Sequence, residues 1–138
     1  STRQVFFNDV KIPIENLLYK RQKGFKIAVN ILNIGRIKLG GVVIGACKGG
    51  VTMSTKYANE REQFGRPISK YGAIRHKIGE MAITTYAAET AVYRATQNID
   101  DAIAALEAEG VEHGEATLKG IAAFAPECAM MKVLCSDV

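Results

Sequence analysis

The sequence contains no tryptophan, only three prolines and two histidines, and three cysteines among its 138 residues. No CxxC pair occurs, so neither a disulfide framework nor a structural zinc site is predicted. The two histidines are far apart and have no partner at ligand spacing, and we predict no metal site. Each cysteine lies among apolar residues, and we expect small buried side chains, which suit a reducing compartment. These five residues are Cys47, Cys128, Cys135, His76 and His113.

The charge is modest and has no strong pattern. The net charge is +4, and the densest basic cluster, Lys20–Lys23, is short. Net charge alone suggests a nucleic-acid-binding bundle, but the basic residues are dispersed and are not interleaved with aromatic residues, so we predict no nucleic-acid partner. The longest apolar run, Leu39–Cys47, is interrupted by glycines and is too short to span a bilayer. We therefore predict no transmembrane segment.

Periodicity predicts a mainly α protein. We expect an up-down helical bundle that is incomplete and carries a short N-terminal β segment at Val5–Phe7. The third helix is expected to be kinked or interrupted at Pro126. The second helix is expected to end near Asp100–Asp101, and Ala102–Glu109 either prolongs it or forms a separate turn; Gly110 ends either version. The expected helices run from Gly24 to about Asn59, from Lys70–Ala73 to one of those two ends, and from Gly114 to Val138.

The first long helix is unusually rich in glycine. Each glycine costs up to about 1 kcal/mol relative to alanine inside a helix, so we expect close approach of another helix or of a ligand. The spacing fits neither GxGxxG nor a P-loop, which excludes a phosphate-binding loop. The expected apolar stripe consists of Phe25, Ala28, Val29, Leu32, Arg36, Leu39, Val43, Ala46 and Met53, and the glycines are Gly35, Gly40, Gly41, Gly45, Gly49 and Gly50.

The exit of this helix, Glu60–Pro67, combines an arginine, an amide and an aromatic ring. Arg61 could bind a diphosphate through a bidentate fork, or it could simply favour the negative end of the helix dipole. Glu60 and Glu62 could be paired catalytic carboxylates, but they point to different sides, and surface ion pairing is the favoured interpretation. The residues alone predict a helical bundle with an exposed arginine–amide–aromatic corner.

Four stretches, in order, resemble the acyl-CoA dehydrogenase family. Lys56–Ile68 (KYANEREQFGRPI) resembles its signature, and Ile31–Arg36 resembles the very-long-chain branch most. The resemblance implies that residues 1–22 are the end of a middle β-domain with its connector, and that residues 23–138 are a truncated C-terminal helical bundle domain. The other three stretches are Phe6–Leu18, Gly24–Ile37 and Ile74–Met81.

The resemblance also implies roles for individual residues. Arg61 matches the arginine that reaches the FAD diphosphate of a neighbouring subunit, and Gln63 and Phe64 match the residues that accompany it. Tyr71 and Gly72 fall where relatives place a pair of side chains near the adenine end of the flavin. The two positions that face the CoA thioester in the family are Asn33 and Arg36.

The implied reaction is α,β-dehydrogenation of a fatty acyl-CoA in β-oxidation. In the family a glutamate removes the α-proton, the β-hydrogen leaves as hydride to FAD, and an electron-transfer flavoprotein accepts the electrons. The catalytic glutamate lies near the carboxy terminus or, in a minority, just before the arginine matched by Arg36, where this chain has Gly35. We therefore expect no catalytic residue in this chain, and an inactive fragment of an active enzyme.

The resemblance leaves an alternative open, and it carries expectations about assembly and location. Because the base is absent and Gly72 has no side chain, the chain could instead be a non-catalytic helical interaction or assembly module. The parent enzyme is expected to be a homodimer or homotetramer. It is expected in the cytoplasm of a bacterium or the mitochondrial matrix of a eukaryote.

Overall fold

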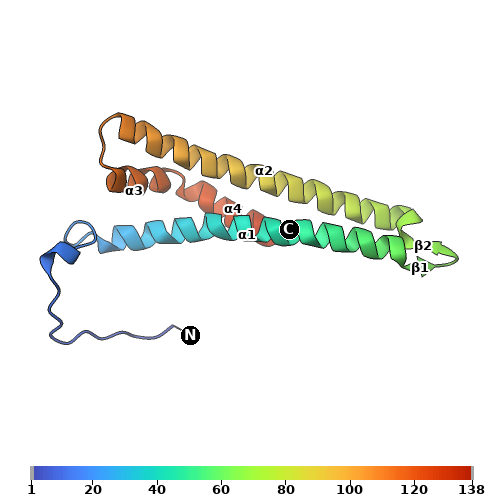
Figure 1. Ribbon diagram of the computed structural model, residues 1–138, viewed down its shortest axis with the longest axis horizontal. Coiled ribbons are helices and arrows are strands. Elements are labelled where there is room, and N and C mark those ends of the chain that lie inside the picture. Colours follow the sequence, from blue (N-terminus) through green and yellow to red (C-terminus); the bar gives the residue numbers. More distant parts are fainter. Residues whose placement is uncertain (1, 138) are drawn as a thin grey trace.

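Two long antiparallel helices form the frame of the molecule, and two shorter helices pack against both of them (Figure 1). The computed structural model describes residues 2–137. The hairpin that joins the long helices projects beyond the end of the bundle. In chain order the elements are η1 (Ile14–Asn16), α1 (Gly24–Glu60), β1 (Glu62–Gln63), β2 (Arg66–Pro67), η2 (Ile68–Lys70), α2 (Gly72–Ala108), α3 (His113–Ala123) and α4 (Ala125–Asp137).

The expected helical bundle is confirmed, but the strand expected at Val5–Phe7 is not formed. Residues 2–13 are a chain without helix or strand, and the side chains of Val5, Phe6 and Phe7 are exposed. A strand needs a neighbouring strand to pair its backbone groups, and no described segment lies beside this one in a ladder. The sheet found in residues 2–137 is the two-stranded hairpin of β1 and β2.

The ends of the long helices follow from local sequence. Helix α1 ends at Glu60, one residue beyond the expected Asn59, where Arg61 turns to extended backbone with φ −77° and ψ 120°. Helix α2 continues to Ala108, which decides between the two ends that the sequence left open. Gly110 has φ +85°, and its N–H donates to the carbonyl of Glu107 at 2.9 Å. This left-handed residue ends the helix, as glycine commonly does.

Pro126 interrupts the last helical segment, as expected. Helix α3 ends at Ala123, and Phe124 leaves the helical region with φ −107° and ψ 24° before α4 begins at Ala125. Proline has no N–H, and in the first turn of a helix that N–H would have no intrahelical partner. The third expected helix is therefore two helices, and the break directs α4 onto α1 while α3 packs on α2.

The core lies where α3 and α4 meet the two long helices. One cluster of buried residues consists of Ile44, Ala88, Val92, Ala95, Met131 and Cys135, and a second consists of Ile99, Ile121 and Cys128. Two of the three cysteines are therefore buried as expected, whereas Cys47 is only half-buried. Burial raises the pKa of the Cys128 and Cys135 thiols, which makes both poor nucleophiles.

The buried face of α1 is not the expected one. Phe25, Leu32 and Met53 are 82%, 59% and 73% exposed, because α1 is apolar on more than one side and its packed side is set by the approach of α2 and α4. Only Gly40 of the six glycines meets another described element closely: a Cβ there would lie 3.0 Å from Val92 Cγ2. Within residues 2–137 the expectation of close helix packing is therefore confirmed at Gly40. The buried residues of α1 are Asn30, Asn33, Gly40, Ile44 and Ala58.

Helix α1 also has the length and apolar composition of a membrane-spanning helix. Its most apolar 18-residue window has a mean hydropathy of 1.5, and 22% of that window is buried. A core helix of a water-soluble protein meets the same criterion, and α1 packs against both α2 and α4. This observation alone is weak evidence for a membrane span.

A histidine–glutamate pair at the turn between α2 and α3 gives stability a pH dependence. His113 Nδ1 lies 2.5 Å from Glu107 Oε1, and this hydrogen bond, with the charge of Glu107, raises the pKa of His113 above its usual 6.5. Because the folded pKa is the higher one, the pair stabilises fully below the unfolded pKa, and the contribution is lost as pH rises through the folded pKa.

We therefore expect His113→Asn to lower the melting temperature at about pH 5.5 and to leave it nearly unchanged at about pH 8.5. Thermal unfolding of both proteins at the two pH values measures the effect. Glu112 also faces His113, but its pKa is lowered by hydrogen bonds from the backbone N–H groups of Gly114 and Glu115, so it stays charged throughout this range. An equal difference at both pH values would contradict this expectation.

Candidate functional site

The hairpin between the long helices places three polar side chains on one face. Gln63 pairs with Arg66. Arg61 lies two residues before Gln63, opposite Ile68, and its carbonyl accepts the N–H of Ile68 at 2.8 Å. Side chains alternate between the two faces of a strand. Arg61, Gln63 and Arg66 therefore share a face, and Glu62 lies on the other. We call the face that carries these three residues the arginine face.

The turn of the hairpin holds an aromatic residue in an unfavourable conformation. Phe64 and Gly65 both have positive φ, +53° and +79°, as a two-residue hairpin turn of type I′ requires. Glycine adopts this region freely, but phenylalanine does not. The side chain of Phe64 is also 93% exposed. A strained and exposed aromatic residue is typical of a binding site.

Tyr71 connects the hairpin to α2. It precedes the first residue of that helix, and its hydroxyl donates to the carbonyl of Gln63 at 2.8 Å. The ring of Phe64 packs edge-on against it, with centroids 6.5 Å apart. The guanidinium of Arg66 lies over its face, with Cζ 4.2 Å from the centroid. The ring of Tyr71 therefore fixes both the tip and one arginine of the hairpin.

The side chain of Arg61 is exposed and makes no ion pair with any residue between 2 and 137. Of the two acids that flank Arg61 in the sequence, Glu60 pairs instead with Lys56 at 4.0 Å, and Glu62 lies on the opposite face of the hairpin. That contact agrees with surface ion pairing, the interpretation that the sequence favoured for Glu60. The guanidinium of Arg61 is thus available to an anion. The remaining flavin candidate, Gly72, is the first residue of α2 and faces open space.

The two substrate candidates, Asn33 and Arg36, also meet, but elsewhere in the fold. Arg36 Nη1 donates to Asn33 Oδ1 at 3.0 Å, and Asn33 is 2% exposed. Asn33 also lines a cavity of about 550 Å³ whose wall includes Asn30, Lys23 and Lys26. Buried amides with cations nearby can bind a polar, anionic ligand.

Two features of these sites were not found by sequence reasoning. One is Arg66, which only the hairpin register places beside Arg61. The other is Glu127, whose Oε2 is buried and has no hydrogen-bond partner among residues 2–137. Both Glu127 and Arg36 act electrostatically on the Cys128 thiol, with opposite effects on its pKa. Glu127 belongs to α4, which packs against α1, and no short motif signals its burial.

The two groups of candidates lie far apart. About 25 residues of straight helix separate Arg36 from Arg61, which is about 38 Å at the rise of an α-helix. That distance exceeds the length of an extended flavin dinucleotide. One flavin bound at the arginine face therefore cannot reach Asn33 and Arg36 of the same chain.

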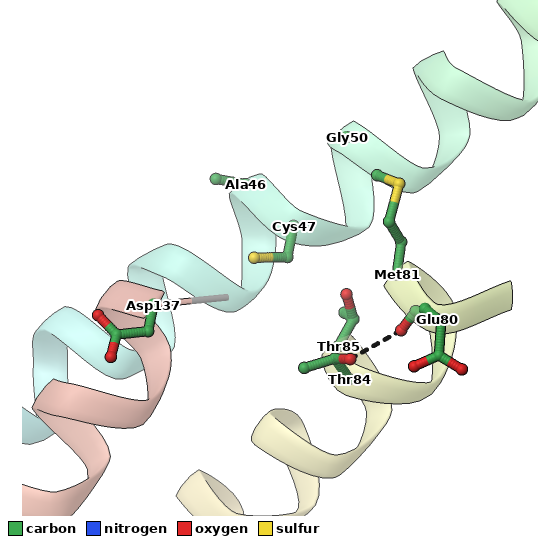
Figure 2. Close-up of a pocket in the computed structure, with 8 residues that line it drawn as sticks. All are labelled: Ala46, Cys47, Gly50, Glu80, Met81, Thr84, Thr85 and Asp137. Carbon is green, nitrogen blue, oxygen red and sulfur yellow. Dashed lines mark hydrogen bonds between the residues drawn. The ribbon is translucent and has the colours of Figure 1, made fainter. Parts of the chain in front are cut away.

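A further hollow contains none of the residues predicted to bind cofactor or substrate. Figure 2 shows this groove, of about 520 Å³, between α1, α2 and the end of α4. Thr84 in its wall donates to the carbonyl of Glu80 at 2.7 Å. The groove brings together no group of three or more metal-ligating side chains, and none is found elsewhere in residues 2–137.

The strain at the hairpin tip gives a prediction that separates stability from binding. We expect Phe64→Gly to leave the free energy of unfolding unchanged or to raise it by up to about 1 kcal/mol, because glycine tolerates positive φ. Denaturant unfolding measures this. The same variant is expected to weaken binding of the flavin that the family resemblance implies, because an exposed ring that can pack on such a ligand is lost. Marked destabilisation would contradict the strain argument.

Comparison with known protein families agrees with this geometry. The profile of the family described as "Acyl-CoA dehydrogenase, C-terminal domain" matches residues 22–138. A "Probable acyl-CoA dehydrogenase" of Bacillus subtilis (strain 168) is 42% identical over 137 residues, which is 99% of this chain and 23% of that protein. The mitochondrial "Very long-chain specific acyl-CoA dehydrogenase" of Mus musculus is 34% identical over 137 residues, which is 99% of this chain and 18% of that protein.

Two solved structures contain similar chains. An acyl-CoA dehydrogenase from Bacillus anthracis complexed with FAD has 44% identity and a TM-score of 0.82, over 91% of this chain and 22% of that one. A chain in the structure of the electron transferring flavoprotein of Acidaminococcus fermentans has 39% identity and a TM-score of 0.59, over 91% of this chain and 31% of that one. The chain thus spans about a quarter or less of the curated relatives described above.

Proposed function

The chain belongs to the acyl-CoA dehydrogenase family, and from that premise we propose that its full-length protein is an FAD-dependent dehydrogenase of fatty acyl-CoA thioesters. In this proposal residues 1–22 are the end of a middle β-domain with its connector. Residues 23–138 are the first part of the C-terminal helical domain. The observation that carries the proposal is the exposed guanidinium of Arg61, which has no ion-pair partner among residues 2–137 and shares a hairpin face with Gln63.

The arginine face fits the diphosphate of FAD. A guanidinium can donate two parallel hydrogen bonds to phosphate oxygens. The Gln63 amide nitrogen donates one N–H to the Glu62 carbonyl at 2.8 Å, and its second N–H can donate to the ligand. Phe64 presents an exposed ring that can pack on the adenine or ribose. Tyr71 holds the hairpin in shape through its bond to the Gln63 carbonyl. Bound FAD supplies the two-electron oxidation, and these residues bind and orient it.

The distance between the candidate sites supports a flavin shared between protomers. The arginine face of one protomer binds the FAD of its neighbour, and the Asn33 and Arg36 region of each protomer faces the thioester in its own site. The exposed apolar side of α1, with Leu32 and Met53, is then covered by other parts of the assembled protein. A homodimer or homotetramer follows from this arrangement.

The chain itself carries no catalytic base in this proposal. The position before Arg36 is Gly35, which has no side chain. The glutamate that removes the α-proton is then outside residues 1–138, and Asn33 and Arg36 orient the thioester. The electrons pass to an electron-transfer flavoprotein. The location is the cytoplasm if the source is bacterial and the mitochondrial matrix if it is eukaryotic, in line with the bacterial and mitochondrial relatives.

The alternative is a non-catalytic relative that uses the same bundle for assembly. The absence of a base at Gly35 and of a side chain at Gly72 favours it. Flavin chemistry separates the two functions. We expect the full-length protein to purify yellow, and its flavin absorbance to bleach when a fatty acyl-CoA is added without oxygen. A yellow protein that no acyl-CoA reduces would favour the assembly function, and a colourless protein unable to bind FAD would contradict both the cofactor and the activity.

A further inference from the structure

We propose that Arg66 is a second diphosphate-binding residue, held in place by Tyr71, and that it binds the same FAD as Arg61. This inference rests on the proposed function and extends its binding site. Neither the sequence motif nor the family resemblance assigned Arg66 a role. The observations that carry it are the pairing of the hairpin, the position of the guanidinium over an aromatic ring, and the charges on each face.

The hairpin register brings the two arginines together. Gln63 pairs with Arg66, and the backbone carbonyl of Arg61 accepts a hydrogen bond from the N–H of Ile68. Arg61 and Arg66 are therefore diagonal neighbours on one face. Diagonal neighbours in an antiparallel pair lie about 7–8 Å apart. Long side chains at that spacing can reach two adjacent phosphate groups. No acidic residue shares the face, since Glu62 is on the opposite one.

Two cations so close repel each other unless an anion lies between them. Arg66, like Arg61, makes no ion pair with the described residues 2–137. The arrangement is therefore unfavourable in isolation. A ligand with two adjacent negative charges would remove the repulsion, and a dinucleotide diphosphate carries exactly one charge on each of its two phosphates.

The ring of Tyr71 orients Arg66 for this task. Cζ of Arg66 lies 4.2 Å from the centroid of the ring, within the range of a cation–π contact. A guanidinium held over a ring by a cation–π contact does not use its N–H groups as hydrogen-bond donors there, and those groups can form bidentate bonds to phosphate. The ring is itself fixed by the bond from its hydroxyl to the Gln63 carbonyl. Tyr71 is thus a positioning residue for Arg66.

The test uses the full-length protein, stripped of flavin and titrated with FAD. We expect Arg66→Ala to raise the Kd for FAD about tenfold or more, as loss of hydrogen bonds to a charged group does. The Kd of Arg66→Lys for FAD should lie between those of the unchanged protein and Arg66→Ala, because lysine keeps the charge and loses the planar fork. The loss in Arg66→Ala should shrink as salt is added, because screening weakens an exposed charge. A salt-independent loss would indicate a structural role and would overturn the proposal.

A double-mutant cycle tests the positioning role of Tyr71. Tyr71→Phe keeps the ring under Arg66 but loses the hydroxyl bond to the Gln63 carbonyl, so it should weaken FAD binding less than a variant that removes the ring. Tyr71→Leu should weaken FAD binding. The double variant that combines it with Arg66→Ala should lose less binding free energy than the sum of the losses in the two single variants. Full additivity would show that Tyr71 does not act through Arg66. Circular dichroism of each variant establishes that the bundle remains folded.

Coenzyme A also contains a diphosphate, so the KM for acyl-CoA is measured at saturating FAD. We expect Arg66→Ala to leave this KM unchanged. A raised KM with unchanged FAD affinity would assign Arg66 to the substrate and overturn the inference. If Arg61→Ala weakens FAD binding and Arg66→Ala does not, the inference fails while the proposed function stands. If neither variant affects FAD, the flavin site on the arginine face is wrong altogether.

Discussion

Replacing Arg61 by alanine is expected to weaken FAD binding by about two orders of magnitude, the upper end for hydrogen bonds to a charged group. The full-length variant should purify nearly colourless. The reason is that a planar guanidinium makes two bonds to the diphosphate and neutralises its charge. Because the Arg61 side chain contacts no acid within residues 2–137, its removal should not unfold the bundle. Flavin content per protomer and the Kd from FAD titration measure the effect.

Two further variants make this result specific. Arg61→Lys keeps the charge but not the fork, and we expect it to recover only part of the affinity. Lys70→Ala removes an exposed cation from η2, just past the hairpin, and we expect it to bind FAD normally. If Lys70→Ala is as weak as Arg61→Ala, general charge and not the arginine face attracts the cofactor. A yellow Arg61→Ala protein with unchanged affinity would contradict the assigned role.

Replacing Gly120 by alanine is expected to destabilise the bundle by about 1–3 kcal/mol, the usual cost of overpacking a filled site. A Cβ there would lie 2.6 Å from Ile103 Cγ1 and 3.3 Å from the Ile103 backbone N. The side-chain atom can move, but the backbone of α2 moves only with the whole helix. The close contact of α3 with α2 therefore depends on this glycine. Chemical denaturation of the full-length protein measures the loss.

Gly41 provides a matched control with the opposite expected sign. It is a glycine inside a helix, but a Cβ there meets nothing within 4 Å among the described residues. Gly41→Ala should therefore stabilise by about 0.5–1 kcal/mol through helix propensity. If Gly41→Ala destabilises instead, that side of α1 is covered by another part of the assembled protein. Equal effects at Gly120 and Gly41 would contradict the packing argument.

The helices were predictable because their signals are local. Pro126 and Gly110 each act on their own backbone, and both end or interrupt a helix where expected. The continuation of α2 beyond Asp101 was left open, because no residue between 102 and 108 either breaks a helix or demands one. The strand expected at Val5–Phe7 depends on a partner strand, which its own residues cannot supply.

The packed face of α1 was not predictable from periodicity. Apolar residues occur on several sides of this helix, so the stripe through Phe25 and Leu32 was as plausible as the one through Gly40 and Ile44. The choice is made by the shapes of α2 and α4, which meet α1 at Gly40 through Val92 and Cys135. Such long-range contacts are not encoded in the spacing of any one helix.

The candidate site was predictable only in part. Arg61 was identified by its motif, but its position relative to Arg66 depends on the register of a two-residue hairpin, which positive φ at Phe64 determines. The cavity beside Asn33 and the buried oxygen of Glu127 depend on where α4 meets α1. The roles of Arg61 and Arg66 toward flavin are proposals that the variants above test.

The most direct test of the flavin site is a crystal structure of the full-length protein with FAD bound. We predict that the guanidinium nitrogens of Arg61 lie about 2.7–2.9 Å from diphosphate oxygens, and that this FAD is the one whose flavin ring sits in the neighbouring protomer. An Arg61 side chain that instead forms an ion pair within its own chain, or that points to a surface where no protomer brings a cofactor, would contradict the assignment.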